Sequence, residues 1–241
     1  MQPKVALFVT CLVDQLFPRV GLAMADVLER AGCAVEFPED QTCCGQPAFN
    51  SGYHDEARAV ARQFLKAFRG YDYIVGPSGS CVSMVAHHYA EIFADDPAVL
   101  LESNTIARKT CEFSRFLTDV LKVEHVGARF PHIVTYHDSC HALRELKTKE
   151  PPRRLLKQVR GLELVEMEAA EECCGFGGTF SVKFPELSGA MARAKIDSIA
   201  KTGAEFVVSI DSSCLMQIDG ALRRAGSPVR TIHLAEVLAH S

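Results

Sequence analysis

The tripeptide Cys43-Cys44-Gly45 occurs twice in this chain of 241 residues, the second time as Cys173-Cys174-Gly175. One cysteine stands before each copy, after a β-branched and aromatic run, and another stands after it beside serines. The two ordered sets are Cys11, Cys43, Cys44 and Cys81, then Cys140, Cys173, Cys174 and Cys214. Because the whole pattern recurs after about 130 residues, it indicates an internal duplication rather than chance.

Strands and helices are expected to alternate in both halves. The first half predicts strands over 4–10, 34–37 and 71–76 and helices over 18–31, 51–69 and 82–93. The second half predicts strands over 132–137, 162–167, 205–210 and 229–234 and helices over 150–159, 185–201 and 215–225. Such alternation is typical of parallel sheets with right-handed crossovers. We therefore predict an α/β protein of two pseudo-symmetric Rossmann-like units, residues 1–125 and 126–241, each a copy of one cysteine-bearing repeat.

The composition is that of an ordinary globular protein, with 48% hydrophobic and 23% charged residues. The net charge of −4 and the lack of a basic run argue against a nucleic-acid partner. No apolar stretch approaches the roughly 20 residues of a membrane helix, and the N-terminal apolar run is too short for a secretory signal. We expect a cytoplasmic protein with no membrane span.

Ten cysteines are many for a cytoplasmic chain, because reducing conditions disfavour structural disulfides there. Two of them, Cys33 and Cys111, fall in helical patterns and suit small core residues. The other eight follow predicted strands, and the carboxyl ends of parallel strands meet at one edge of a sheet. We expect one site in each half, where four thiolates converge and need a cation to share their charge.

Thiolate sites select zinc, copper(I) or iron–sulfur clusters. Zinc commonly uses Cys-x2-Cys pairs, whereas the larger iron–sulfur cluster accepts ligands from separated loops, so the adjacent cysteines favour iron. We predict all eight motif cysteines as metal ligands, with zinc in one site left open. Gly45 and Gly175 are expected to donate backbone N–H groups to the sulfurs, and Ser80 and Ser213 to donate hydroxyls.

The polar residues near the motifs leave several roles open. His137 and His141 flank Cys140 and suit a cluster ligand, a proton relay or a substrate contact, and His137 also suits a hydrogen-bond donor beside the cluster. Arg19 and Arg144 could hold a carboxylate, but nothing in the sequence singles either out. A nicotinamide site is rejected because the glycine-rich run after Cys174 lacks the third glycine of the dinucleotide motif.

The cysteine pattern resembles the pair of CCG (cysteine-rich) domains found in heterodisulfide reductase and in the iron–sulfur components of glycolate and glycerol-3-phosphate oxidation. A closer resemblance is to the lactate-utilisation protein A family. It is carried by residues 5–14, 41–53, 77–81, 136–141 and 172–178 and extends over nearly the whole chain. The resemblance implies a role in oxidising L-lactate to pyruvate beside two partner proteins, at least one of which is a further iron–sulfur protein.

One position departs from the heterodisulfide reductase pattern, in which the last cysteine opens a Cys-x2-Cys pair. Met84 and Gln217 stand at that position, so each half has four motif cysteines, which match one [4Fe–4S] cluster with one thiolate per iron. We expect an electron-transfer subunit, a non-autonomous oxidoreductase component, in a complex that oxidises L-lactate or a related 2-hydroxy acid. The alternatives are a heterodisulfide-reductase-like catalytic redox subunit and a zinc-binding structural or assembly module.

Overall fold

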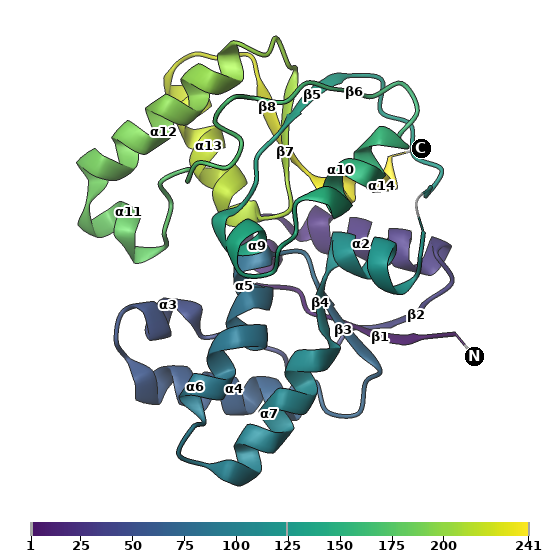
Figure 1. Ribbon diagram of the computed structural model, residues 1–241, viewed down its shortest axis with the longest axis vertical. Helices are drawn as coiled ribbons and strands as arrows, with labels where there is room; N and C mark the ends of the chain where they lie inside the picture. The colour runs from purple at the N-terminus through teal and green to yellow at the C-terminus, as the bar shows by residue number, and fades with distance from the viewer. Residues whose placement is uncertain (1, 124, 241) are drawn as a thin grey trace.

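Two four-stranded parallel sheets, one from each half of the chain, form the frame of the computed structural model, which describes residues 2–123 and 125–240 (Figure 1). The first sheet runs in the order β2 (Ala34–Glu36), β1 (Lys4–Leu7), β3 (Tyr73–Gly76) and β4 (Thr110–Glu112). The second runs in the order β6 (Glu163–Leu164), β5 (Ile133–Tyr136), β7 (Phe206–Ser209) and β8 (Arg230–His233). Every pairing in both sheets is parallel. The predicted α/β class with two Rossmann-like units is confirmed.

Helices connect the strands in both halves. Those of the first half are α1 (Cys11–Leu16), α2 (Pro18–Arg30), α3 (Gln46–Asn50), α4 (His54–Ala67), α5 (Gly79–Ser83), the π-helical η1 (Met84–His88), α6 (Tyr89–Ile92), α7 (Pro97–Lys109), α8 (Phe113–Arg115) and the π-helical η2 (Phe116–Val120). Those of the second half are α9 (Cys140–Arg144), α10 (Glu150–Lys157), α11 (Thr179–Lys183), α12 (Pro185–Ala200), α13 (Ser212–Arg224) and α14 (Leu234–Ala239). All predicted strands and helices are present, with boundaries shifted by a few residues.

The local sequence explains the longer helices. Helix α4 buries Ala57, Ala61, Phe64 and Leu65, which recur at helical spacing along one face. Helix α2 begins with Pro18 at its first turn, where the missing N–H costs nothing, and is followed by Gly32 in the left-handed conformation at φ +85°.

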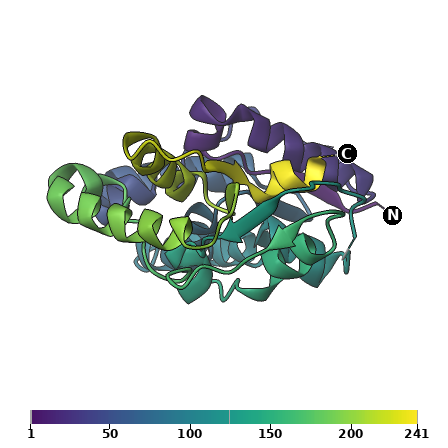
Figure 2. The same cartoon turned by 90° about the horizontal axis from the view of Figure 1, so that it is seen from above.

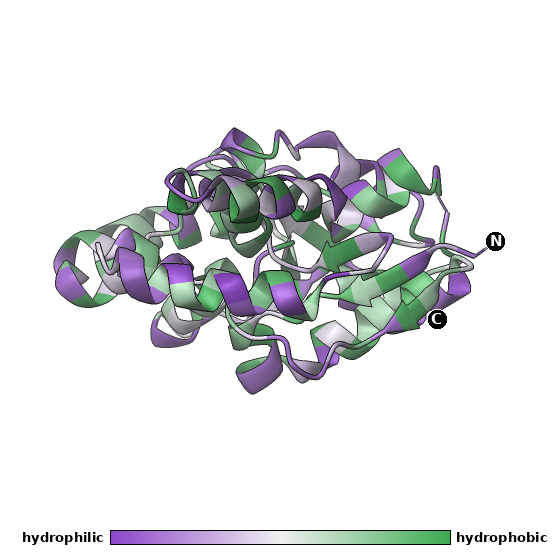
Figure 3. Ribbon diagram, turned by 90° about the horizontal axis from the view of Figure 1, so that it is seen from below, coloured by the Kyte–Doolittle hydropathy of each residue, from purple (hydrophilic) through white to green (hydrophobic). Residues whose placement is uncertain are grey.

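The largest core is shared by the two halves. Side chains from one face of each sheet meet there around α2, α10 and α14, which lie between the sheets (Figure 1). Separate apolar cores cover the outer face of each sheet, under α4 to α7 in the first half and under α12 and α13 in the second. Figure 3 accordingly shows helices that alternate hydrophilic and hydrophobic residues around strands that are mainly hydrophobic. The division at residue 125 remains a prediction.

Cys33 and Cys111 do not lie in helices, so this part of the sequence prediction is wrong. Cys111 is the middle residue of β4, where it pairs with Val75. The run Thr110 to Glu112 is too short to read as a strand, and it directly continues the helical pattern of α7. Cys33 follows the end of α2 and lies buried in the shared core, as expected for a small hydrophobic residue.

Helices α11 and α12 extend to one side of the molecule, opposite the side where both chain ends lie (Figure 2). Among the described helices, none combines the length and the apolar character that crossing a membrane requires.

Candidate metal centre

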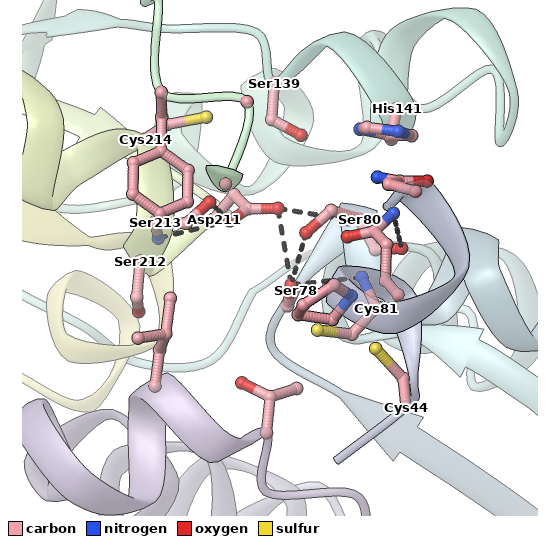
Figure 4. Close-up of a pocket in the computed structure, with 18 of the residues that line it drawn as sticks. Cys44, Ser78, Ser80, Cys81, Ser139, His141, Asp211, Ser212, Ser213 and Cys214 are labelled. Atoms are coloured by element: carbon pink, nitrogen blue, oxygen red, sulfur yellow. Dashed lines mark hydrogen bonds between the residues drawn. The ribbon is translucent and has the colours of Figure 1, made fainter. Parts of the chain in front are cut away.

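All eight motif cysteines line a single cavity of about 250 Å³ between the two halves. Figure 4 shows part of it, with Cys44, Cys81 and Cys214 labelled. Four of them sit where a helix begins, because Cys11 and Cys140 are the first residues of α1 and α9, and Cys81 and Cys214 lie in the first turns of α5 and α13. The Cys-Cys-Gly segments supply the other four. Helix α5 of the first half packs against α9 of the second, and α1 of the first half packs against α13 of the second, so the two halves contact each other at the cavity.

The first quartet consists of Cys11, Cys43, Cys44 and Cys81. Cys11 Sγ lies 3.7 Å from Cys43 Sγ, and the backbone N–H of Gly45 donates to Cys43 Sγ at 3.4 Å. Gly45 is left-handed at φ +86°, and a Cβ there would stand 3.3 Å from the carbonyl oxygen of Ala57. Glycine therefore lets the backbone turn its N–H toward the sulfur while packing against α4.

The second quartet consists of Cys140, Cys173, Cys174 and Cys214. Gly175 repeats the turn at φ +87°, and its N–H donates to Cys173 Sγ at 3.4 Å. A Cβ on Gly175 would stand 2.6 Å from the carbonyl oxygen of Ser188 in α12. His141 Nδ1 lies 3.6 Å from Cys140 Sγ. The two quartets thus share one local geometry.

Each quartet holds one thiol that loses its proton readily. The pKa of Cys43 is lowered to about 3, because the thiols of Cys11 and Cys44 donate hydrogen bonds to its sulfur and the Gly45 N–H adds another. The same hydrogen bonds to Cys43, together with burial, raise the pKa of Cys11 and of Cys44. Once Cys43 is a thiolate, deprotonation of Cys11 and Cys44 is therefore less favourable.

The second quartet behaves in the same way. Hydrogen bonds from Cys140 and Cys174, with the Gly175 N–H, lower the pKa of Cys173 to about 2. The bond to Cys173 and burial raise the pKa of Cys140 and of Cys174. Because four thiolates cannot form together in a half-buried space without a cation, both donor sets fit a thiophilic metal group.

Ser78 and Asp211 meet where the two halves touch. Asp211 is buried and accepts from Ser78 Oγ at 3.3 Å and from the Ser80 N–H at 3.0 Å (Figure 4). Its other oxygen accepts from the N–H and the hydroxyl of Ser213, the latter at 2.6 Å. The hydroxyl of Ser213 is thus directed to Asp211, while that of Ser80 lies 3.1 Å from Ser78 Oγ. The hydrogen bonds expected from the hydroxyls of Ser80 and Ser213 to the cysteine sulfurs remain a prediction.

Asp211 was not singled out from the sequence. It occupies the position of Ser78 when the two repeats are aligned on Cys81 and Cys214. This difference between the repeats, a carboxylate in place of a hydroxyl, was the feature of the sequence that could have identified Asp211 as a residue of the site.

His137 is fully buried behind the second quartet. Its ring nitrogen, Cys174 Sγ and Cys214 Sγ all lie within 4.8 Å of one another. Neither ring nitrogen has a hydrogen-bond partner among the described residues. Burial, with the nearby Lys195, lowers the pKa of His137 to about 3, so the imidazole is neutral at pH 7. A buried polar ring without a partner costs free energy, and a metal group in the quartet would supply the partner.

Four other residues weighed in the sequence do not line the cavity. Met84 is fully buried in the core of the first half, and Gln217 donates to Ser188 Oγ at 2.9 Å. Arg19 and Arg144 are exposed. None of these four is among the described residues that line the cavity.

A buried ion pair beside His137 was also missed. Arg153 makes two 2.8 Å bonds to the Asp138 carboxylate, and both side chains are buried. The pair fixes the segment between β5 and Cys140 to helix α10. Arg153 was missed because it lies in a strongly charged stretch of sequence, and such a stretch by itself predicts a helix face exposed to solvent.

The family of cysteine-rich domains, CCG, matches this chain twice, at residues 5–86 and 134–219. Lactate utilization protein A of Exiguobacterium sp. is 51% identical over 238 residues, which are 98% of this chain and 97% of that protein. Lactate utilization protein A of Geobacillus thermodenitrificans is 50% identical over 237 residues, 98% of this chain and 99% of that protein.

A solved structure with a similar fold is a hypothetical protein from Helicobacter pylori, with a TM-score of 0.69 and 12% identity. The match covers 98% of this chain and 48% of that chain. At this identity the likeness concerns the fold alone.

Proposed function

This chain belongs to the lactate utilization protein A family and carries its cysteine-rich domain twice, and from that membership we propose that it is an iron–sulfur electron-transfer subunit in lactate oxidation. Each quartet, Cys11 with Cys43, Cys44 and Cys81 and Cys140 with Cys173, Cys174 and Cys214, would hold one [4Fe–4S] cluster. The bound clusters would supply one-electron redox chemistry. The substrate of the complex would be L-lactate or a related 2-hydroxy acid.

The observation that carries this proposal is the pair of equivalent thiol quartets in one cavity. Gly45 and Gly175 each aim a backbone N–H at a sulfur, which stabilises the thiolate form that a metal requires. Met84 and Gln217 are not among the described residues that line the cavity, so each site is offered four cysteines, as one cubane cluster needs. This count favours electron relay over the disulfide chemistry of a five-cysteine site.

The proposed role requires partners. The chain would pass electrons between a dehydrogenase and an acceptor, and a second iron–sulfur protein would be one of the other subunits. We place the complex in the reducing cytoplasm, where free thiols persist.

Zinc in the second site is the alternative that a specific observation favours. His137, Cys174 and Cys214 present nitrogen and sulfur atoms within 4.8 Å of one another, a donor set that zinc also accepts. The first quartet has Phe8 where the second has His137, so this alternative concerns the second half only.

Anaerobic purification followed by iron, sulfide and zinc analysis tests both possibilities. The proposal expects about eight iron and eight sulfide per chain, with Cys43→Ser and Cys173→Ser each losing about half. Cys33→Ala serves as the matched control, because Cys33 is buried in the shared core away from both quartets. Near-stoichiometric zinc with four irons would support the alternative, and zinc without iron or sulfide would refute electron transfer.

A further inference from the structure

The walls behind the two quartets differ at one pair of equivalent positions. Phe8 and His137 each stand three residues before the first cysteine of a set. Their backbones occupy the same place, because the N–H of Phe8 donates to Val75 O and that of His137 donates to Val208 O, both at 2.9 Å. One half therefore presents a phenyl ring where the other presents an imidazole.

Phe64 and Lys195 form the second such difference. Gly45 packs on Ala57 of α4 and Gly175 packs on Ser188 of α12. Two helical turns further along each helix stand Phe64 and Lys195, both fully buried. In the first half Phe64 packs edge-on against Phe8, with the ring centroids 4.8 Å apart. The second half has Lys195 and His137 in place of this aromatic pair.

His137 faces the second quartet, and Lys195 is buried close enough to act on it electrostatically. The His137 ring, without a partner among the described residues, lies within 4.8 Å of the sulfurs of Cys174 and Cys214. Lys195 Nζ donates to the carbonyl oxygen of Ala169, and it interacts electrostatically with the same two cysteines. The chain thus places two buried polar groups at this site.

Hydrogen-bond donors and positive charge beside a cluster favour its reduced form, because reduction adds negative charge that they stabilise. A phenyl ring offers neither. The electrostatic effect is large in a buried site, where little water screens it.

We propose that His137 and Lys195 raise the reduction potential of the second site above that of the first, so that the second site is reduced first. The proposal rests on the iron–sulfur function proposed above. His137 and Lys195 act on the cluster through its sulfurs and are tuning residues, not ligands.

The test is an anaerobic redox titration followed by EPR on full-length protein with one site at a time. Cys43→Ser/Cys44→Ser leaves the second site, and Cys173→Ser/Cys174→Ser leaves the first. The second site should show the higher midpoint potential. In the protein that retains only the second site, His137→Phe should lower that potential by about 59 mV, the equivalent of a tenfold change in the one-electron equilibrium.

Three further variants separate tuning from folding. Lys195→Met should also lower the potential of the second site, whereas His137→Gln, which keeps an N–H donor, should retain most of it. In the protein that retains only the first site, Phe8→His should raise the potential. Phe8→Leu, made in the protein that retains only the second site, is the matched control and should change nothing there.

The outcomes distinguish the two proposals. A cluster in the second site whose potential equals or falls below that of the first overturns this inference and leaves the proposed function standing. The inference is also overturned, with the proposed function left standing, if neither His137→Phe nor Lys195→Met changes the potential of the second site. Absence of iron and sulfide from the second site alone overturns this inference, and their absence from both sites overturns the proposed function as well.

Discussion

Gly79→Ala should weaken the contact that joins the two halves at the cavity. Gly79 is the first residue of α5, and a Cβ there would stand 2.5 Å from Ala142 Cβ and 3.0 Å from Ser139 Oγ. Carbon atoms pack at about 3.5–4.0 Å, so α5 and α9 would have to part by about 1 Å. Overpacking of this kind costs about 1–3 kcal/mol, and the gain in helix propensity returns at most about 1 kcal/mol. Because the Cβ of Ala142 cannot rotate out of the way, the upper part of that range, about 2–3 kcal/mol, applies, and a net loss of about 1–2 kcal/mol remains.

The assay is thermal unfolding of the anaerobic protein, together with its iron content. For a chain of this size the loss corresponds to a melting temperature lower by roughly 2–8 °C. Because α5 carries Cys81 and α9 begins at Cys140, both sites should lose iron together. Gly220→Ala is the control, since Gly220 lies inside α13 with nothing within 4 Å of the added Cβ, and it should stabilise slightly. Unchanged melting and iron content in Gly79→Ala would refute the reasoning.

Two further substitutions test buried charge. Arg153→Met should cost about 3–5 kcal/mol in chemical denaturation, because it leaves the buried Asp138 carboxylate without its partner, whereas loss of the exposed Lys149 should leave the midpoint unchanged. An Arg153→Met midpoint equal to wild type would contradict this. Burial raises the pKa of Glu112 from 4.5 to about 7, so the folded state holds this proton more tightly than the unfolded chain does. The free energy of unfolding should therefore fall by on the order of 3 kcal/mol as the pH rises from 4.5 to 7. Glu112→Gln, which can still accept from the Ser114 N–H, should flatten that slope in denaturation curves recorded across the range, and an unaltered slope would count against the assignment.

The repeat made the fold predictable from the sequence. Apolar periodicity located every strand and helix that it was used to predict, because those segments pack one face against a core. It missed β4 because Thr110 to Glu112 holds a buried glutamate and becomes a strand only through pairing with β3. Short segments of this kind take their structure from a neighbouring backbone, and their own sequence does not reveal it.

The site was predictable in part for the same reason. Sequence spacing and the edge rule for parallel sheets brought each quartet together, but they say nothing about how two sheets dock. The single cavity depends on α5 crossing α9 and on α1 crossing α13. Lys195 was missed because a lysine in a helix usually lies in solvent, and only the packing of α12 on its sheet buries it.

The contact between Ser78 and Asp211 explains why the halves of a duplicated chain had to differ where they meet. These two residues occupy equivalent positions and approach each other across the boundary, where they form an isolated antiparallel bridge. Two aspartates there would place like charges together in a buried space, and two serines would leave the N–H groups of Ser80 and Ser213 without a common acceptor. One serine and one aspartate satisfy both sides. This contact beside the cavity therefore favours an asymmetric pair, and the presence of Phe8 in one repeat and His137 at the equivalent position of the other extends that asymmetry to the walls behind the cysteines.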